Sequence, residues 1–102
     1  MSLTKKYLKT RPVCKVTFKI PKKAAKGARE INIVGDFNSW NEAANPMKSL
    51  KNGGFTLTLD LNKDREYQFR YLFDSICWEN DWAADKYMPS TMGNCDNSVV
   101  VL

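Results

Sequence analysis

Four segments of this 102-residue chain alternate between apolar and polar side chains with a period of two. Such alternation is typical of β-strands that have one face against a core and the other in solvent. A short mixed segment and a short apolar run predict two further strands near the C-terminal end. The six expected strands are residues 14–20, 31–33, 55–61, 67–73, 76–79 and 99–102.

Turn-forming residues separate these segments, as in Asn-Gly-Gly at 52–54 and Asn-Lys-Asp at 62–64. Residues 22–26 and 83–88 are each long enough for a single helical turn and too short for a packed helix. Short strands joined by turns favour a sandwich of antiparallel sheets over a βαβ arrangement. The pattern therefore predicts one all-β domain.

Length and composition limit the class of protein further. A chain of this length forms one domain, and it has no apolar run approaching twenty residues, so we expect no membrane partner. No apolar segment follows the basic N-terminus, which argues against a secretory signal and predicts a cytoplasmic protein. Cys14, Cys77 and Cys95 leave one thiol unpaired and lack C-x-x-C spacing, which suits a reducing compartment and predicts no metal site.

The net charge of +5 is unevenly distributed. Residues 1–30 carry ten basic side chains and one carboxylate, whereas residues 31–102 carry six basic side chains and ten carboxylates. We interpret residues 1–12 as a basic N-terminal extension and residues 13–102 as the sandwich domain. A solvated basic segment explains the charge more simply than a nucleic-acid footprint, so no nucleic-acid partner is expected.

Catalytic chemistry has little support in the sequence. The chain contains no histidine, which excludes Ser-His-Asp and Cys-His arrangements. A pair of carboxylates drawn from Glu79, Asp81 and Asp85 would suit a glycosidase, but a small sandwich has little room for the deep cleft such an enzyme needs. No phosphate-binding or metal-ligand motif is present. We therefore expect no catalytic residue, no cofactor and no enzymatic activity.

Three tryptophans lie among polar and turn-forming residues rather than within an apolar alternation. Trp40 ends the segment Gly-Asp-Phe-Asn-Ser-Trp at residues 35–40, while Trp78 and Trp82 flank Glu-Asn-Asp. Exposed indoles suit sugars, because the C–H face of a pyranose ring stacks on them while its hydroxyls form hydrogen bonds at the edge. The alternative is that an indole fills the end of the sandwich, and this is our expectation for Trp82.

The Gly-Asp-Phe-Asn-x-Trp segment at 35–40, combined with Tyr-x-Phe-x-Tyr-x-x-Asp at 67–74, resembles carbohydrate-binding module family 48. That family includes the glycogen-binding domain of the AMP-activated protein kinase β subunit and the N-terminal domains of isoamylases and glycogen branching enzymes. The resemblance extends from residue 13 to residue 102. It implies an immunoglobulin-like β-sandwich of the early-set type.

The resemblance also implies a set of carbohydrate-binding residues. Two tryptophans match those that stack on glucose rings, and Arg70 stands where a lysine hydrogen-bonds sugar hydroxyls. Met92 stands where a leucine packs into the curve of the glucan. Two asparagines match or lie near positions that contact hydroxyls. The expected site residues are Trp40, Arg70, Trp78, Met92, Asn94 and Asn97.

By the same resemblance, the function is that of a non-catalytic module that binds α-1,4-glucans such as glycogen, starch and malto-oligosaccharides through tryptophan stacking. The alternative is an accessory domain without sugar affinity that docks to or regulates a glycan-metabolising enzyme, because related domains often contact a neighbouring catalytic domain. The expected partners are thus an α-glucan or such an enzyme. The loops at residues 75–77 and 93–98 are each one residue longer than the family pattern.

Overall fold

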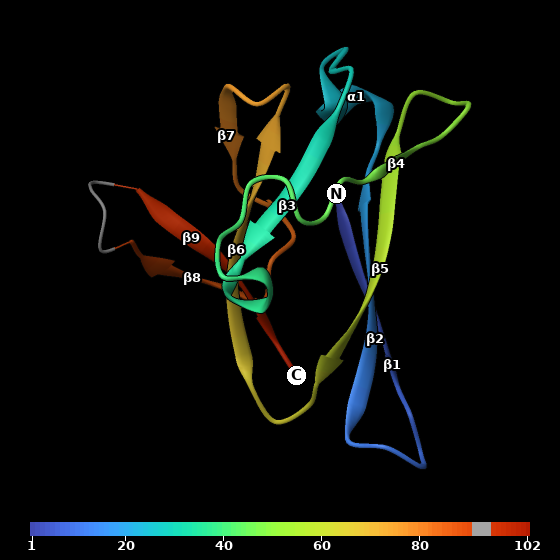
Figure 1. Cartoon of the computed structure of the whole chain (residues 1–102), viewed down its shortest axis with the longest axis vertical. Coiled ribbons are helices and arrows are strands. Elements are labelled where there is room, and N and C mark those ends of the chain that lie inside the picture. Colours follow the sequence, from blue (N-terminus) through green and yellow to red (C-terminus); the bar gives the residue numbers. More distant parts are fainter. Residues whose placement is uncertain (91–94) are drawn as a thin grey trace.

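The computed structural model describes residues 1–90 and 95–102, and in these residues two antiparallel sheets pack face to face (Figure 1). Sheet A has the strand order β1-β2-β5-β4, and sheet B has the order β3-β6-β9-β8, with β7 also paired to β6. The elements are β1 (Ser2–Tyr7), β2 (Val13–Ile20), α1 (Lys22–Ala25), β3 (Ile31–Gly35), the 3₁₀ turn η1 (Asp36–Asn38), β4 (Lys48–Ser49), β5 (Phe55–Asn62), β6 (Glu66–Phe73), β7 (Cys77–Glu79), β8 (Lys86–Pro89) and β9 (Asp96–Val101).

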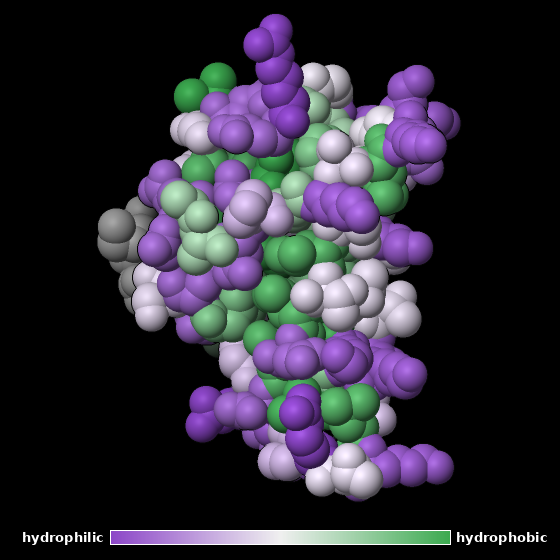
Figure 2. All heavy atoms as spheres, turned by 45° about the vertical axis from the view of Figure 1, so that its right-hand side comes forward, coloured by the Kyte–Doolittle hydropathy of each residue, from purple (hydrophilic) through white to green (hydrophobic). Residues whose placement is uncertain are grey.

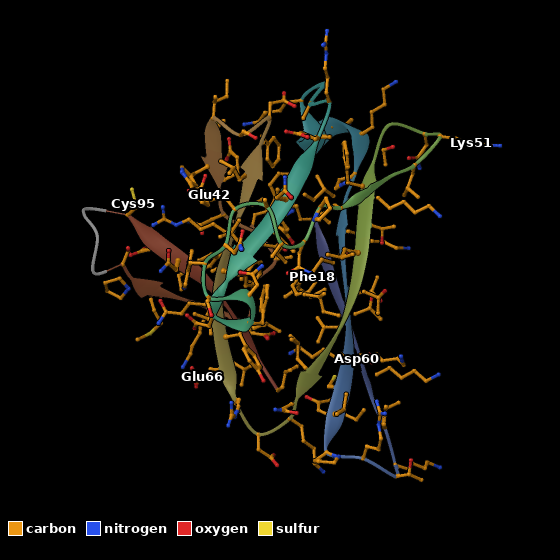
Figure 3. All side chains as sticks on the ribbon, viewed as in Figure 1. Phe18, Glu42, Lys51, Asp60, Glu66 and Cys95 are labelled. Atoms are coloured by element: carbon orange, nitrogen blue, oxygen red, sulfur yellow. The ribbon has the colours of Figure 1, made fainter. Side chains whose placement is uncertain are left out.

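The core fills the space between the two sheets, where Phe18 points inward in Figure 3. Alternate residues of β2 and β6 are buried there, as their apolar periodicity predicts. The ring of Phe18 packs edge-on against that of Phe69, with centroids 5.3 Å apart. The predicted immunoglobulin-like sandwich is confirmed.

All six expected strands are present, with bounds shifted by a few residues. The C-terminal strand β9 lies between β6 and β8, which explains its nearly continuous apolar run. The helical turn expected at residues 22–26 is α1. The helical turn considered at residues 83–88 is wrong, because this segment enters β8 and forms a ladder with β9.

Strand β1 lies within residues 1–12, where the sequence pattern predicted no strand. It pairs with β2 along its whole length, from Ser2 opposite Lys19 to Tyr7 opposite Cys14. The half-buried Leu3 packs against the core from this strand. The division of the chain at residue 13 stays a prediction. Among the described residues, no helix has the length and apolar character to cross a membrane.

Candidate functional site

The segment after β3 folds tightly onto β6 and positions Trp40. Gly35 lies so close to β6 that a Cβ atom there would collide with the carbonyl oxygen of Gln68 and with Phe69. A glycine is therefore required for this close approach of two backbones. Phe37 follows and turns into the core, with its ring centroid 6.1 Å from that of Phe18.

Polar side chains of η1 hold the loop in shape. The Asn38 amide donates to the carbonyl oxygen of Ile33 at 3.0 Å and to Oδ1 of Asn45 at 2.7 Å, and its own oxygen accepts from the Gly35 N–H at 3.1 Å. The Asp36 carboxylate accepts the Gln68 N–H at 2.8 Å. Each residue of the Gly-Asp-Phe-Asn segment therefore has a structural role, and this leaves Trp40 as the side chain that the loop presents.

Trp40 has a left-handed backbone conformation with φ of 57°, as does Ser39 before it. Such a conformation is unfavourable for a bulky residue and is retained where the surroundings enforce it. Here the Trp40 N–H donates to the Gly35 carbonyl at 2.9 Å, and the indole Nε1 donates to Oδ1 of Asp36 at 2.9 Å. The indole is 36% exposed, so a ring fixed at one edge keeps part of its surface open to solvent.

Trp78 lies on β7, directly opposite Leu72 of β6, and is 41% exposed. The turn before it contains two left-handed residues, Asp74 and Ser75, and places Ile76 in solvent. The Asp74 carboxylate anchors this turn by accepting two backbone N–H groups of residues 29 and 30. The longer turn noticed in the sequence is thus accommodated before β7, and Trp78 shares the outer face of sheet B with Arg70.

Arg70 belongs to a row of side chains that crosses the outer face of sheet B. The strand register places it opposite Val34 on one side, and its Nε donates to Oδ1 of Asn97 on the other at 2.6 Å. Asn97 in turn donates from Nδ2 to Oε1 of Gln68 at 3.0 Å and lies opposite Met88 of β8. Because a guanidinium group has five N–H donors, the bond to Asn97 fixes Arg70 while leaving its terminal nitrogens available to a ligand.

These elements meet at a hollow of about 320 Å³ that is lined by Trp40, Glu42, Arg70 and Trp78. The two indoles come from segments 38 residues apart in the sequence, and the tertiary structure brings them to one depression with a cation and a carboxylate. Figure 3 shows Glu42 on the sheet B side of the molecule, away from sheet A. The hollow offers apolar faces and hydrogen-bonding edges together, which is the combination a sugar ring requires.

The structure separates the expected site residues into groups. Trp40, Arg70 and Trp78 line the hollow, whereas Asn97 is only 7% exposed and has both ends of its amide engaged by Arg70 and Gln68. Asn97 therefore lies behind the arginine rather than at the surface. The expected residues Met92 and Asn94 lie outside the described residues.

Sequence reasoning missed Glu42 and Met88. Glu42 lines the hollow two residues after Trp40, and this proximity is the only sequence feature that points to it. Met88 is 40% exposed on the outer face of sheet B, opposite Asn97. It could be found only after β8 had been recognised as a strand.

Trp82 is 63% exposed, so the expectation that it fills the end of the sandwich is wrong. The neighbouring Asp81 is the residue that enters the interior, with no exposed surface. Its Oδ2 accepts from the Tyr71 hydroxyl at 2.7 Å, and its backbone N–H donates to Ser98 Oγ at 2.8 Å. The segment is therefore anchored by an aspartate, which leaves the adjacent indole in solvent.

The three carboxylates considered above for a glycosidase pair all have structural partners. Asp81 binds Tyr71, Glu79 forms an ion pair with Lys26 at 2.9 Å, and Asp85 forms one with Lys5 at 2.7 Å.

Burial of Tyr71, together with the adjacent Asp81 charge, raises the pKa of its hydroxyl well above the usual value. The hydrogen bond that Lys26 donates to the Glu79 carboxylate, together with the charge of that carboxylate, raises the pKa of Lys26. Among residues 1–90 and 95–102, no cluster of three or more potential metal ligands occurs.

The comparison with protein families fits this geometry. The model of carbohydrate-binding module 48, the isoamylase N-terminal domain, matches residues 16–87. The chain belongs to this family. The module 48 match includes Trp40, Glu42, Arg70 and Trp78, the four residues that line the hollow. None of the curated proteins matches the chain.

Proposed function

We propose that this module 48 domain binds α-1,4-glucans without acting on them, and that the hollow lined by Trp40, Glu42, Arg70 and Trp78 is its binding site. The observation that carries the proposal is the convergence of two half-exposed indoles on one depression beside a fixed guanidinium group. Each indole offers an apolar face to a glucose ring, because the C–H groups of a pyranose stack on aromatic surfaces.

Hydrogen bonds at the edges of the hollow orient the sugar rings that stack on the indoles. Arg70 donates from its terminal nitrogens to sugar hydroxyls, and Glu42, which also lines the hollow, accepts from hydroxyls. Asn97 contributes by holding the guanidinium group from behind at 2.6 Å. Met88, further along the same row, provides an apolar contact for a longer chain, a role that the sequence analysis gave to Met92.

Isothermal titration with maltoheptaose, a linear α-1,4-glucan, tests the proposal. We expect saturable binding with a micromolar to millimolar dissociation constant and a change in tryptophan fluorescence. Cellohexaose, whose β-1,4 linkages give a straighter chain, serves as the matched control and should bind at least about tenfold more weakly. Absence of heat and fluorescence changes with maltoheptaose at millimolar concentration would show that the proposal is wrong.

A further inference from the structure

Three rows of side chains cross the outer face of sheet A. The strand register of β1, β2, β5 and β4 aligns them, and they alternate with the residues that enter the core. In order, the rows are Ser2, Lys19, Thr56 and Lys48; Thr4, Thr17 and Thr58; and Lys6, Lys15 and Asp60. We call these ten residues the cationic face. Figure 2 turns the sheet A side forward and shows a near-neutral band between hydrophilic bands at the right.

The charge of the cationic face is only partly balanced within the molecule. Lys15 pairs with Asp60 at 3.1 Å, and Arg11 reaches the same carboxylate at 3.9 Å. In the described part of the chain, Lys6, Lys19 and Lys48 form no ion pair. Lys6 even lies directly opposite Lys15, an arrangement of like charges that destabilises a sheet. These three lysines are therefore not balanced by a carboxylate of the described residues.

The arrangement of groups on this face indicates what kind of anion it suits. The two lysine-bearing rows are separated by four residues along β2, about 13 Å, and a row of threonines lies between them. The hydroxyls of Thr17 and Thr58 are 2.9 Å apart, and either can donate to an anion. The ten residues include no aromatic ring for base stacking and no large apolar side chain for insertion into a bilayer.

Asp60 helps to distinguish between anionic partners. With Asp60 the face carries both signs of charge, and a protein surface can match such a pattern by placing acidic residues opposite the lysines and a basic residue near Asp60. Figure 3 shows Asp60 pointing away from sheet B, on the side of the molecule opposite Glu42. The cationic face and the glucan hollow therefore lie on opposite sheets of the sandwich.

We infer that the cationic face is a docking surface for an acidic surface of a partner protein. Strands β1 and β2 supply three of the four lysines of the face, so the face uses part of the basic charge found in the first thirty residues. Docking of a partner to the cationic face does not depend on glucan binding. Docking on sheet A leaves the hollow on sheet B accessible, so the domain can hold a partner and a glucan at the same time.

The inference is tested by binding to poly-L-glutamate, a defined acidic polypeptide. The polypeptide carries a fluorescent label, and its anisotropy is measured against domain concentration at 0.15 M salt. The test variant Lys6→Gln/Lys19→Gln/Lys48→Gln removes the three unpaired lysines of the face. The control variant Lys23→Gln/Lys51→Gln/Lys63→Gln removes the same charge from exposed residues of α1 and two turns. We expect the test variant to raise the dissociation constant at least about tenfold and the control to change it less than about twofold. If both variants lost the same affinity for poly-L-glutamate, binding would depend on net charge alone and not on this face, and the inference would be overturned.

Further measurements distinguish the other anionic partners. Tighter binding to a duplex DNA or to phosphatidylserine vesicles than to poly-L-glutamate would overturn the assignment to an acidic protein. Self-association of the wild-type domain that the test variant abolishes would overturn it in favour of a second copy of the chain.

Thermal unfolding provides the folding control, and the test variant should melt no lower than wild type, because it removes the repulsion between Lys6 and Lys15. A saturating amount of maltoheptaose should leave poly-L-glutamate binding unchanged, and competition between them would contradict separate faces.

Discussion

The indole Nε1 of Trp40 donates to Oδ1 of Asp36 at 2.9 Å, while Oδ2 of the same carboxylate accepts the backbone N–H of Gln68 at 2.8 Å. One side chain thus links the ring that we propose for sugar stacking to the central strand of sheet B. A ring held in this way loses less conformational freedom when a ligand binds, which favours affinity.

Replacing Asp36 should weaken glucan binding without unfolding the domain. In Asp36→Ala the indole of Trp40 loses its anchor, and we expect the maltoheptaose dissociation constant to rise about five- to tenfold, or about 1 kcal/mol. Isothermal titration measures the change. Asp60→Ala, an exposed carboxylate on the other sheet, is the matched control and should bind as wild type does. An unchanged affinity in Asp36→Ala would show that the anchor is not needed for binding.

The three tryptophans should differ in their effect on binding although all are at least one-third exposed. Trp40→Ala and Trp78→Ala each remove a stacking surface from the hollow, so each should raise the dissociation constant for maltoheptaose at least about tenfold, or about 1.4 kcal/mol. Trp82→Ala removes the most exposed of the three indoles, which does not line the hollow, and this variant should bind maltoheptaose as wild type does. A loss with Trp82→Ala equal to the other two would place the site elsewhere.

Asn97 and Arg70 should act as one unit. Because Asn97 holds the guanidinium group at 2.6 Å and is itself buried, Asn97→Ala should weaken maltoheptaose binding through Arg70. We expect each single replacement by alanine to cost about 1 kcal/mol of binding free energy and the double variant to cost little more than Arg70→Ala alone. Titration of the four proteins completes the cycle. Additive losses would mean that Asn97 contacts the sugar directly, as the sequence comparison implied.

The buried bond between Tyr71 and Asp81 should appear in the pH dependence of stability. The pKa of Tyr71 is raised in the folded state, so above about pH 10 the unfolded chain releases this proton while the folded chain keeps it. The folded state then binds more protons than the unfolded state, and the free energy of unfolding falls as the pH rises.

Tyr71→Phe removes both the titration and the donor to Asp81. At pH 8 we expect a loss of about 1–3 kcal/mol, because a buried carboxylate oxygen is left without its partner. Between pH 10 and 11 the variant should lose stability less steeply than wild type. Urea denaturation at both ends of this range gives the comparison. Parallel curves for the two proteins would contradict the assigned role of Tyr71.

Sequence alone determined the strands whose alternation is strong, together with their inner faces. In β2 and β6 the apolar residues recur every second position, and a period of two has only one way to place them against a core. The segment Gly-Asp-Phe-Asn-x-Trp likewise pointed to Trp40, because its turn-forming residues end a strand and leave an indole with no apolar neighbours in the chain.

Only the tertiary structure decided which residues meet. Strands β1, β4 and β8 are held mainly by their neighbours in the sheets, so their own sequences carry a weak pattern. The pairing of Arg70 with Asn97 and the alignment of Lys6, Lys19 and Lys48 on one face follow from strand register. Asp81 lies in the loop between β7 and β8 and is buried through its bonds to Tyr71 and Ser98, while the adjacent Trp82 stays exposed. Register joins positions far apart in the chain, and local periodicity contains no information about which distant strand becomes a neighbour.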